Sequence, residues 1–410
     1  MNPFKSFRML MLFASVLFCC SCQQSESNET TPLEWGTRMA DSDMKRNPDA
    51  SKLDFSTEPK WSYTQGLVCL ADQRLAAETG DQKYYRYGLN YANKMIDDEG
   101  NIATYNMEKY NLDLINSGNI LFEIYEKTGA EKYKKAIFQL REQLKNQPRT
   151  SEGGFWHKEV YTNQMWLDGI YMADPFYAQF GKKFDEPEAF DDVENQLIVI
   201  QKHTHDSITG LNYHGWDESR KQQWADSLTG HSPHVWGRAQ GWYLMALVDL
   251  LDFFPLDHPG RDKVIEILNT VASAVVAVQD SASAVWYQVP DLGGREGNYL
   301  EATASSMFIY ALLKGVRMGY LDQSYLAPAK KGFDGILNNF IEKNGDETIS
   351  LTSCCAVAGL GGNPYRDGSY EYYINTEVRD NDPKGIGPFI MACIEMDKAT
   401  KLTEPVSRNR

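Results

Sequence analysis

The sequence predicts an all-α protein, an (α/α)6 barrel of six helical hairpins in a single domain, and three observations lead to this fold class. Nearly every segment after residue 32 has apolar residues at the spacing that is typical of helices. Short turns join the expected helices in pairs. The pairs contain helices of two kinds, apolar all round and amphipathic, as an inner and an outer wall require.

Twelve helices are expected along the chain, and no low-complexity linker divides it after residue 32. Each expected helix carries apolar residues at helical spacing, and most end near a turn signal. The expected ranges are 34–46, 61–79, 82–97, 113–129, 131–146, 167–181, 187–203, 235–254, 261–278, 301–319, 323–342 and 385–399.

Short turns that contain glycine mark the hairpins. The stretches "ETGDQKY", "EKTGAEKY" and "QFGKKFDEPEAF" each place a Gly just past an expected helix end, where a C-cap residue is needed. Helices joined by such turns pack as antiparallel neighbours. The connections between hairpins are longer and richer in Trp, His and Gly, so we expect them to gather at one end and build a site there.

The expected helices also differ in burial. The stretch "VWGRAQGWYLMALVDLLDFF" (235–254) is apolar nearly all round, whereas "EKYKKAIFQLREQLKN" (131–146) has one apolar face. This contrast fits the inner and outer walls of a closed double ring. An open α-solenoid is the alternative, but the sequence shows no clear repeat of fixed period.

The N-terminus is predicted to be a secretory signal rather than part of the fold. The stretch "MNPFKSFRMLMLFASVLFCCSC" combines the basic Lys5 and Arg8 with an apolar run, small residues and cysteines. This order is typical of bacterial lipoproteins, in which the Cys that follows the cleavage point is lipidated. Cys22 is the expected lipidation site, because Ser21 precedes it, and Cys20 is the alternative.

The expected organisation follows from this signal. Residues 1–21 form the signal peptide, residues 22–32 form a polar, flexible tether, and residues 33–405 form the catalytic barrel. The expected location is the cell envelope, as a periplasmic or outer-membrane lipoprotein. The N-terminal lipid would then be the attachment to the membrane.

The composition is acidic, with a net charge of −15 and a pI of about 5.0. Nucleic acid is excluded as a partner, because phosphate binding needs a basic surface. An anionic substrate would have to be held by a few local cations. The nine Trp and 23 Tyr offer flat faces that suit sugar rings, which slightly favours a carbohydrate. The oligomeric state stays open.

No cofactor or metal is expected. The pair of histidines at 203 and 205 lacks a third ligand, which favours a solvated loop over a metal site. The stretch "GLGGNPYRDGSYEYY" lacks the preceding strand of a phosphate loop and contains Pro364. The cysteines after the signal have no metal-ligand spacing and are expected to be buried thiols: Cys69, Cys354, Cys355 and Cys393.

The stretch "QMWLDGIYMADPFYAQFG" places two carboxylates in an apolar, aromatic segment. Carboxylates are seldom fully buried without a partner. Asp168 fits a hydrogen-bonded structural carboxylate and a catalytic group equally well. Asp174 precedes Pro175, a pair that is common at helix starts, so we expect Asp174 to be a cap or to lie at a kink.

Other connections supply further polar residues. Asp113 lies at the start of an expected helix, where the helix dipole favours an acid. Arg238 and Trp242 are four residues apart and share one helix face. An arginine beside an indole on an inner helix could bind a carboxylate and stack on a ring.

Five stretches of the sequence resemble glycoside hydrolase family 105, the unsaturated rhamnogalacturonyl hydrolases. The resemblance covers most of the chain after the signal, and its W-x-D-G and W-G-R-x-x-G-W elements are specific in combination. The stretches are "GGFWHKEVYTNQMWLDGIYMADPFYAQFG", "LNYHGWDES", "HVWGRAQGWYLMALVDLLDFFP", "GNYLEATASSMFIYALLKG" and "KGIGPFIMACIE". Members of this family form (α/α)6 barrels, in agreement with the helix pattern.

The resemblance implies roles for seven residues. Asp168, in "WLDG", corresponds to the catalytic acid, and Asp113, in "NLDLIN", corresponds to a second active-site aspartate. The positions that would contact the substrate are Tyr63, His157, His214, Arg238 and Trp242.

The implied substrate is the unsaturated uronic acid that a polysaccharide lyase leaves at a non-reducing end. Its C4=C5 bond is an enol ether, so cleavage needs a proton at C4 and water at C5. A carboxyl group that keeps its proton near neutral pH can deliver that proton. Apolar burial and a nearby ionised Asp113 would both favour the protonated form of Asp168, and Arg238 would bind the substrate carboxylate.

Three alternatives remain open from the sequence alone. An unsaturated glucuronyl hydrolase would act on other acidic glycans by the same chemistry. An inverting glycosidase on the same barrel would instead use two carboxyl groups to activate water at C1. A glycan-binding lipoprotein without chemistry would explain the aromatic residues and the tether, but it gives no reason for paired aspartates.

Overall fold

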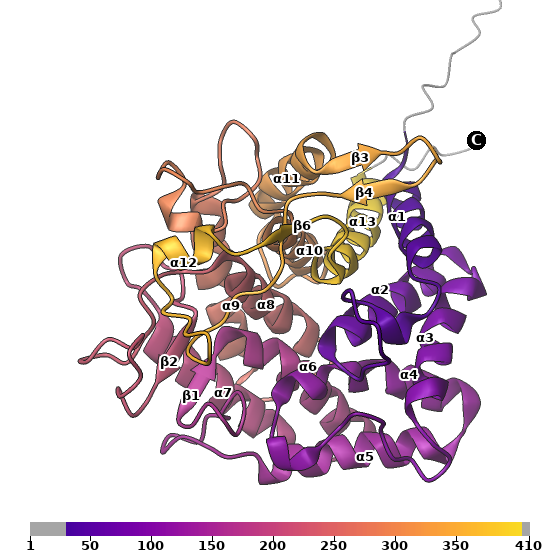
Figure 1. Cartoon of the computed structure of the whole chain (residues 1–410), viewed down its shortest axis with the longest axis horizontal. Coiled ribbons are helices and arrows are strands. Elements are labelled where there is room, and N and C mark those ends of the chain that lie inside the picture. Colours follow the sequence, from indigo (N-terminus) through magenta and orange to yellow (C-terminus); the bar gives the residue numbers. More distant parts are fainter. Residues whose placement is uncertain (1–29, 404–410) are drawn as a thin grey trace, which may run out of the picture. The chain divides into compact units, whose positions relative to one another are not determined.

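Helices make up most of this protein, as a computed structural model describing residues 30–403 shows (Figure 1). Within these residues there are twelve long helices and one short helix, α12 (Tyr370–Ile374). The long helices are α1 (Pro32–Arg46), α2 (Tyr63–Thr79), α3 (Gln82–Met95), α4 (Asn119–Thr128), α5 (Glu131–Asn146), α6 (Leu167–Phe184), α7 (Glu188–Thr204), α8 (Gly237–Leu250), α9 (Arg261–Ala277), α10 (Ala302–Arg317), α11 (Leu326–Asn339) and α13 (Pro383–Thr403).

Six of these helices form an inner ring and six an outer wall, so the predicted (α/α)6 barrel is confirmed. Around the ring, neighbouring inner helices contact one another in the order α2, α4, α6, α8, α10 and α13, and α13 returns to α2. Each of the first five packs against the helix that follows it in the chain. The sixth hairpin is different, because α13 packs against α1, so two helices from opposite ends of the described chain lie side by side (Figure 1).

The two predicted kinds of helix match these positions. Every residue of α8 is buried, as an inner helix requires, whereas α5 buries one face only. The turns after α2 and α4 have the expected glycines, Gly80 and Gly129, with φ of 75° and 66°. The expected cap at Gly181 is wrong, since α6 continues to Phe184 and ends at Asp185 with φ of 56°. Gly181 instead permits close packing, because a Cβ there would lie 2.8 Å from that of Ala189.

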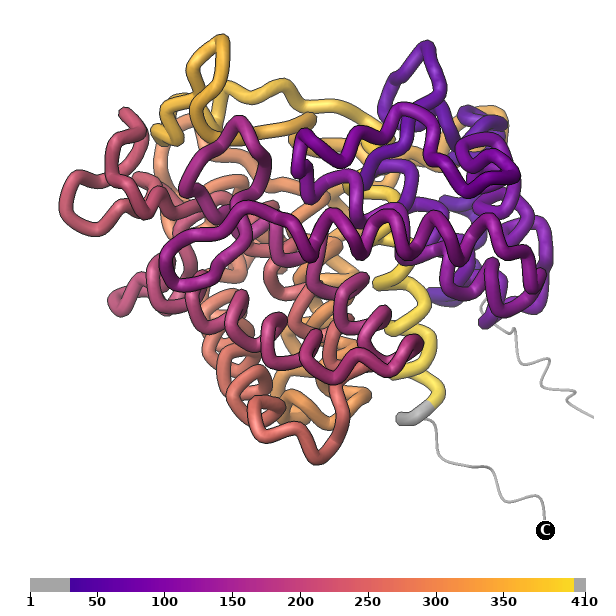
Figure 2. Tube along the Cα trace, turned by 90° about the horizontal axis from the view of Figure 1, so that it is seen from below, coloured from indigo at the N-terminus to yellow at the C-terminus, as the bar shows by residue number. Residues whose placement is uncertain are grey.

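The long connections gather at the end of the barrel where the inner helices begin. Seen from the side, these loops lie along the top, and α13 descends from them in yellow (Figure 2). Three antiparallel strand pairs stiffen the loops: β1 (Gln164–Trp166) with β2 (Gly215–Asp217), β3 (Ile341–Lys343) with β4 (Ile349–Leu351), and β5 (Cys354–Cys355) with β6 (Val378–Arg379).

Of the two roles expected for Asp174, the helix cap is wrong, and the position at a kink stays a prediction. Asp174 lies in the middle of α6, with Pro175 also inside the helix. Proline has no N–H, so the carbonyl of Tyr171, four residues earlier, loses its helical partner. The side-chain amide of Asn116 donates to that carbonyl at 3.1 Å. This replacement hydrogen bond lets α6 pass through Pro175, and it leaves Asp174 buried.

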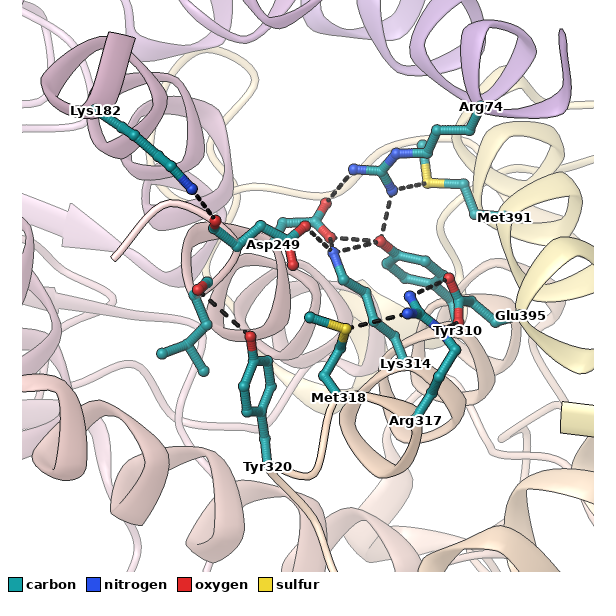
Figure 3. Close-up of polar contacts among 12 residues, drawn as sticks. Arg74, Lys182, Asp249, Tyr310, Lys314, Arg317, Met318, Tyr320, Met391 and Glu395 are labelled. Carbon is teal, nitrogen blue, oxygen red and sulfur yellow. Dashed lines mark hydrogen bonds and ion pairs between the residues drawn. The ribbon is translucent and has the colours of Figure 1, made fainter. Parts of the chain in front are cut away.

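A buried network of charges holds the other end of the ring (Figure 3). Lys314 of α10 donates to Asp249 of α8 at 2.7 Å and to Asp252 at 2.6 Å. Arg74 of α2 reaches Asp249 at 3.2 Å, and Tyr310 donates to the same carboxylate. Three inner helices are thereby joined through one aspartate.

Other expectations concern the cysteines and the N-terminus. The thiols of Cys69, Cys354, Cys355 and Cys393 are free and buried, as predicted. Among residues 30–403, no helix is both long enough and apolar enough to span a membrane. The predicted signal peptide, most of the tether and the expected lipidation site Cys22 lie outside the described residues.

Candidate active site

One pocket at the loop-covered end brings together six of the seven site residues that the sequence predicted. Its volume is about 70 Å³, and the six are Tyr63, Asp113, His157, Asp168, Arg238 and Trp242. The rest of its lining consists of Lys158, Tyr161, Trp166, Met172, Trp236, Val357, Ala358 and Arg366. Segments more than 300 residues apart in the chain therefore form one cavity.

Asp168 is positioned by the junction of a strand and a helix. β1 ends at Trp166, and Asp168 is the second residue of α6. The backbone N–H of Leu167 donates to the carbonyl of His214 at 3.0 Å, which continues the β1–β2 pairing. The Asp168 side chain is 13% exposed, so it is largely desolvated and still reaches the pocket.

His214 lies behind Asp168. It is fully buried, and its Nε2 is 3.3 Å from Oδ2 of Asp168. Its Nδ1 lies 2.8 Å from the hydroxyl of Tyr373, which fixes the orientation of the ring. His214 is therefore close to the Asp168 carboxyl, and the substrate contact that the resemblance implies for it stays a prediction.

Asp113 is held as an ionised carboxylate. It lies in a short 3-10 turn, Leu112–Leu114, and its oxygens are 2.6 Å from Nζ of Lys158 and 3.3 Å from Nε2 of His157. Burial alone would raise its pKa, but Lys158 and His157 together hold the pKa well below its usual range. The pocket that Asp168 lines therefore also contains an ionised carboxylate.

Arg238 brings a positive charge to the pocket floor. It is the second residue of α8, it is 1% exposed, and Nη1 donates to the carbonyl of Ala356 at 3.0 Å. Within the described residues, the carboxylate that comes within 4.0 Å of Arg238 is that of Glu301, at 3.9 Å. Its Nε and Nη2 have no hydrogen-bond partner there. Buried donors of this kind favour an anionic group on a bound molecule.

Aromatic rings form the remaining walls. Trp242 stacks on Tyr171 at 4.9 Å and meets Tyr63 edge to face at 6.0 Å. Trp166 stacks on His157 at 4.6 Å and on Tyr161 at 4.6 Å. Flat aromatic faces and charged groups in one pocket suit a sugar ring that carries a carboxylate.

Sequence reasoning missed two cations of this pocket. Lys158 was overlooked, although it directly follows His157. Arg366 belongs to the stretch that was considered, and rejected, as a phosphate loop. Its guanidinium donates to the hydroxyl of Tyr161 at 2.8 Å and to the carbonyl of Gly361 at 2.8 Å. The signal that could have found both is their positive charge in long connections of an acidic chain.

A metal centre has little support elsewhere in the described residues. One group there has the spacing of metal ligands: Asp191, Glu194 and His258. Nδ1 of His258 accepts the backbone N–H of Gly260 at 3.1 Å, so a neutral His258 carries its proton on Nε2. That nitrogen lies 3.3 Å from Asp191, which makes the group a hydrogen-bonded pair beside a glutamate.

Comparison with known proteins agrees with this site. The sequence model of Glycosyl Hydrolase Family 88 matches residues 35–400. The chain belongs to this family. A solved structure described as a family 105 glycoside hydrolase of C. acetobutylicum is 45% identical to this member, with a TM-score of 0.85 over 89% of this chain and 99% of that one. The resemblance to family 105 is thereby confirmed.

Two relatives of this protein have also been named, one without and one with an activity in its name. "Protein Atu3128" of Agrobacterium fabrum is 38% identical over 230 residues, which are 55% of this chain and 97% of that protein. An unsaturated rhamnogalacturonyl hydrolase, YesR of Bacillus subtilis, is 23% identical over 273 residues, 65% of this chain and 74% of that protein. The protein is therefore a glycoside hydrolase of the unsaturated uronyl hydrolase group.

Proposed function

We propose that this hydrolase acts on the unsaturated galacturonyl–rhamnose disaccharide that a lyase releases from rhamnogalacturonan. The observation that carries the proposal is the buried Arg238, whose guanidinium has unpartnered donors in the same pocket as Asp113 and Asp168. The name of the Bacillus subtilis relative supports the choice of this aglycone.

In the proposed reaction, Arg238 binds the substrate carboxylate, which is conjugated to the C4=C5 bond. Asp168 gives its proton to C4, and the positive charge that develops at C5 is shared with the ring oxygen. Water adds to C5 and returns a proton to the Asp168 carboxylate. The hemiketal opens, expels the aglycone and leaves a 5-dehydro-4-deoxyuronate.

Asp113 has a different part in this reaction. Because Lys158 and His157 keep it ionised, it is a poor proton donor. Its negative charge stabilises the positive charge that develops at C5. The two aspartates thus divide the tasks of proton donor and electrostatic partner.

The decisive experiment follows the conjugated double bond by ultraviolet absorbance with the unsaturated disaccharide in heavy water. We expect loss of the absorbance, deuterium at C4 of the uronate product, and no cleavage of the saturated disaccharide. Asp168→Asn should lower kcat by several orders of magnitude with unchanged circular dichroism, since asparagine has no proton to give. Cleavage of the saturated disaccharide at a similar rate, without deuterium at C4, would contradict this mechanism and favour that of an inverting glycosidase.

A second candidate is an unsaturated glucuronyl hydrolase. It uses the same chemistry and differs in the sugar that follows the unsaturated ring. That sugar would meet Tyr161 and Arg366 at the pocket wall. Comparing kcat/KM for unsaturated disaccharides with rhamnose, glucose and amino-sugar aglycones distinguishes the two. A preference for the amino-sugar series would contradict the rhamnogalacturonyl assignment.

A further inference from the structure

A second, much smaller cavity lies behind the active-site pocket. Its volume is about 10 Å³, close to what one water molecule needs. His157 and Trp166 belong to the walls of both cavities. The small cavity is otherwise enclosed by residues on β1, α6, α7 and nearby loops: Leu112, Phe155, Met165, Gly169, Ile170, Asp174 and Gln196.

Three buried polar atoms on this wall have no hydrogen-bond partner within the described residues. They are Nδ1 of His157 and both carboxyl oxygens of Asp174. The two side chains belong to residues that are 3% and 1% exposed. Gln196, the other polar residue of the wall, has its amide engaged, since it accepts from Phe155 N at 2.7 Å and donates to Gly153 O at 3.0 Å. Buried polar atoms without partners are rare in folded proteins.

The state of each group follows from its surroundings. Burial raises the pKa of Asp174 well above its usual value, and Asp192 adds to this effect while Arg149 opposes it. The carboxyl group is also buried without a hydrogen-bond or ion-pair partner among the described residues, which favours its neutral form. On the other side of the ring, Nε2 of His157 lies 3.3 Å from the ionised Asp113. A neutral His157 with its proton on Nε2 leaves Nδ1 as an acceptor that needs a donor.

We infer that one water molecule in the small cavity joins the Asp174 carboxyl to Nδ1 of His157, and that Asp174 is thereby a positioning residue for the active site. The carboxyl O–H donates to the water, and the water donates to Nδ1. This arrangement fixes the tautomer of His157 and keeps its N–H directed at Asp113. Gly169 lets the His157 ring lie close to the backbone of α6, because a Cβ at residue 169 would be only 3.1 Å from Nδ1 of His157.

The chain Asp174–water–His157–Asp113 explains why a carboxyl group is retained inside an apolar helix. Asp174 touches neither the pocket nor a reacting atom, so its effect would pass through the orientation of His157 and Asp113. The inference rests on the proposed function only for the test that measures turnover. The tautomer of His157 can be measured without any substrate.

The first test uses the unaltered protein with ¹⁵N-labelled histidine. Long-range ¹H–¹⁵N spectra distinguish the two tautomers, and His157→Gln identifies the signals. We expect neutral His157 with its proton on Nε2. A proton on Nδ1 would overturn the inference whatever the enzyme turns over, and an inactive parent with the expected tautomer would contradict only the proposed function.

The second test compares Asp174→Asn with Asp174→Leu. Asparagine is neutral and can still donate to the water, so kcat should stay within about threefold of the parent. Leucine cannot donate, so kcat should fall about tenfold or more while KM changes less than twofold. Equal losses in both variants at equal folded fraction, or full activity of Asp174→Leu, would overturn the inference. If the leucine variant does not fold, the asparagine variant and the tautomer still decide.

Discussion

At the scale of single residues, the carboxylate of Asp113 owes its charge to its neighbours. Desolvation opposes ionisation, and the close ammonium of Lys158 with the ring of His157 outweighs it. The effect is mutual. Burial lowers the pKa of Lys158, but Asp113 raises it by more, so the pKa of Lys158 lies above its usual value. Charge in this pocket is therefore a property of the group of three and of no single residue.

The Lys158→Met variant should make the enzyme more sensitive to acid. Without the ammonium, the pKa of Asp113 rises toward that of an ordinary carboxyl, so Asp113 takes up a proton at a higher pH than in the parent. The acid limb of the kcat/KM profile should move up by about one pH unit or more. Lys158→Arg, which keeps the positive charge, is the control and should leave that limb in place. An unmoved limb in the methionine variant would show that Lys158 does not set the state of Asp113.

Sequence reasoning identified the residues of this site that have local signatures. Asp168 could be predicted because a carboxylate stands out in an aromatic stretch, and because its motif resembles a known family. For Arg366 the positive charge in a long connection was the only signal, since its place depends on a loop that meets Tyr161, 205 positions earlier, only in the folded ring. The cap expected at Asp174 was wrong because Pro175 usually starts a helix, and the amide of Asn116 that replaces the lost hydrogen bond is 55 positions away from Tyr171 in sequence.

At the scale of single elements, α1 has a well-capped N-terminus and a buried carboxyl group that destabilises it when ionised. Thr31 and Glu34 form a capping box at its first turn. Further along, Asp43 is 1% exposed, and only one of its oxygens has a partner, the side chain of Asn47 at 2.9 Å. Burial raises its pKa to about 6 from 3.8, while Arg46 and Asn47 lower it.

This shift gives α1 a pH-dependent contribution to stability. The folded state binds the Asp43 proton more tightly than the unfolded chain does, so the contribution is full below about pH 4 and is lost as pH rises to about 6. Asp43→Asn should therefore raise the free energy of unfolding at pH 7.5 by up to about 3 kcal/mol, and by much less at pH 4. Urea unfolding at both pH values measures this.

The exposed Asp98 provides the control for that prediction. Asp98→Asn should leave the free energy of unfolding nearly unchanged at both pH values, because substitutions at exposed positions usually change stability by little. A gain for Asp43→Asn that is equal at pH 4 and pH 7.5 would show that the effect comes from packing and not from the proton.

Most elements could be predicted from local patterns. The glycine turns at Gly80 and Gly129 require a left-handed residue, and the sequence carries that signal in each case. The end of α6 could not be predicted, because Gly181 is needed for packing against α7 and Asp185 takes the left-handed position. Glycine serves both purposes, and the sequence does not distinguish them.

At the scale of the whole molecule, the barrel separates chemistry from structural charge. The pocket lies where the inner helices begin, whereas the network around Lys314 lies near their other ends (Figure 3). Arg238 and Asp249 are both on α8, and eleven residues correspond to about 16 Å along its axis. Burial would raise the pKa of Asp249, but Arg74 and Lys314 lower it to about 2.

Lys314→Met should destabilise the protein with little effect on turnover. It leaves the buried Asp249 with Arg74 as its remaining cation and the partly exposed Asp252 without its ammonium partner, at a cost of roughly 3–5 kcal/mol. Thermal unfolding should show a clearly lower Tm, while kcat at 25 °C stays close to that of the parent. Lys263→Met removes an exposed ion pair with Glu266 and should cost at most about 1 kcal/mol. Similar Tm values for the two variants would refute a structural role of the network.

The sixth hairpin also sets the order in which the enzyme can be made. Every residue that lines the pocket lies between positions 63 and 366, so a growing chain contains the complete site before α13 exists. The ring, however, closes only when α13 inserts between α2 and α10 and packs against α1. A nascent chain thus keeps an apolar gap open until α13 is synthesised. α1 and α13 lie more than 300 residues apart in sequence, and contacts between such distant segments form slowly. Activity should therefore appear only once α13 has been synthesised.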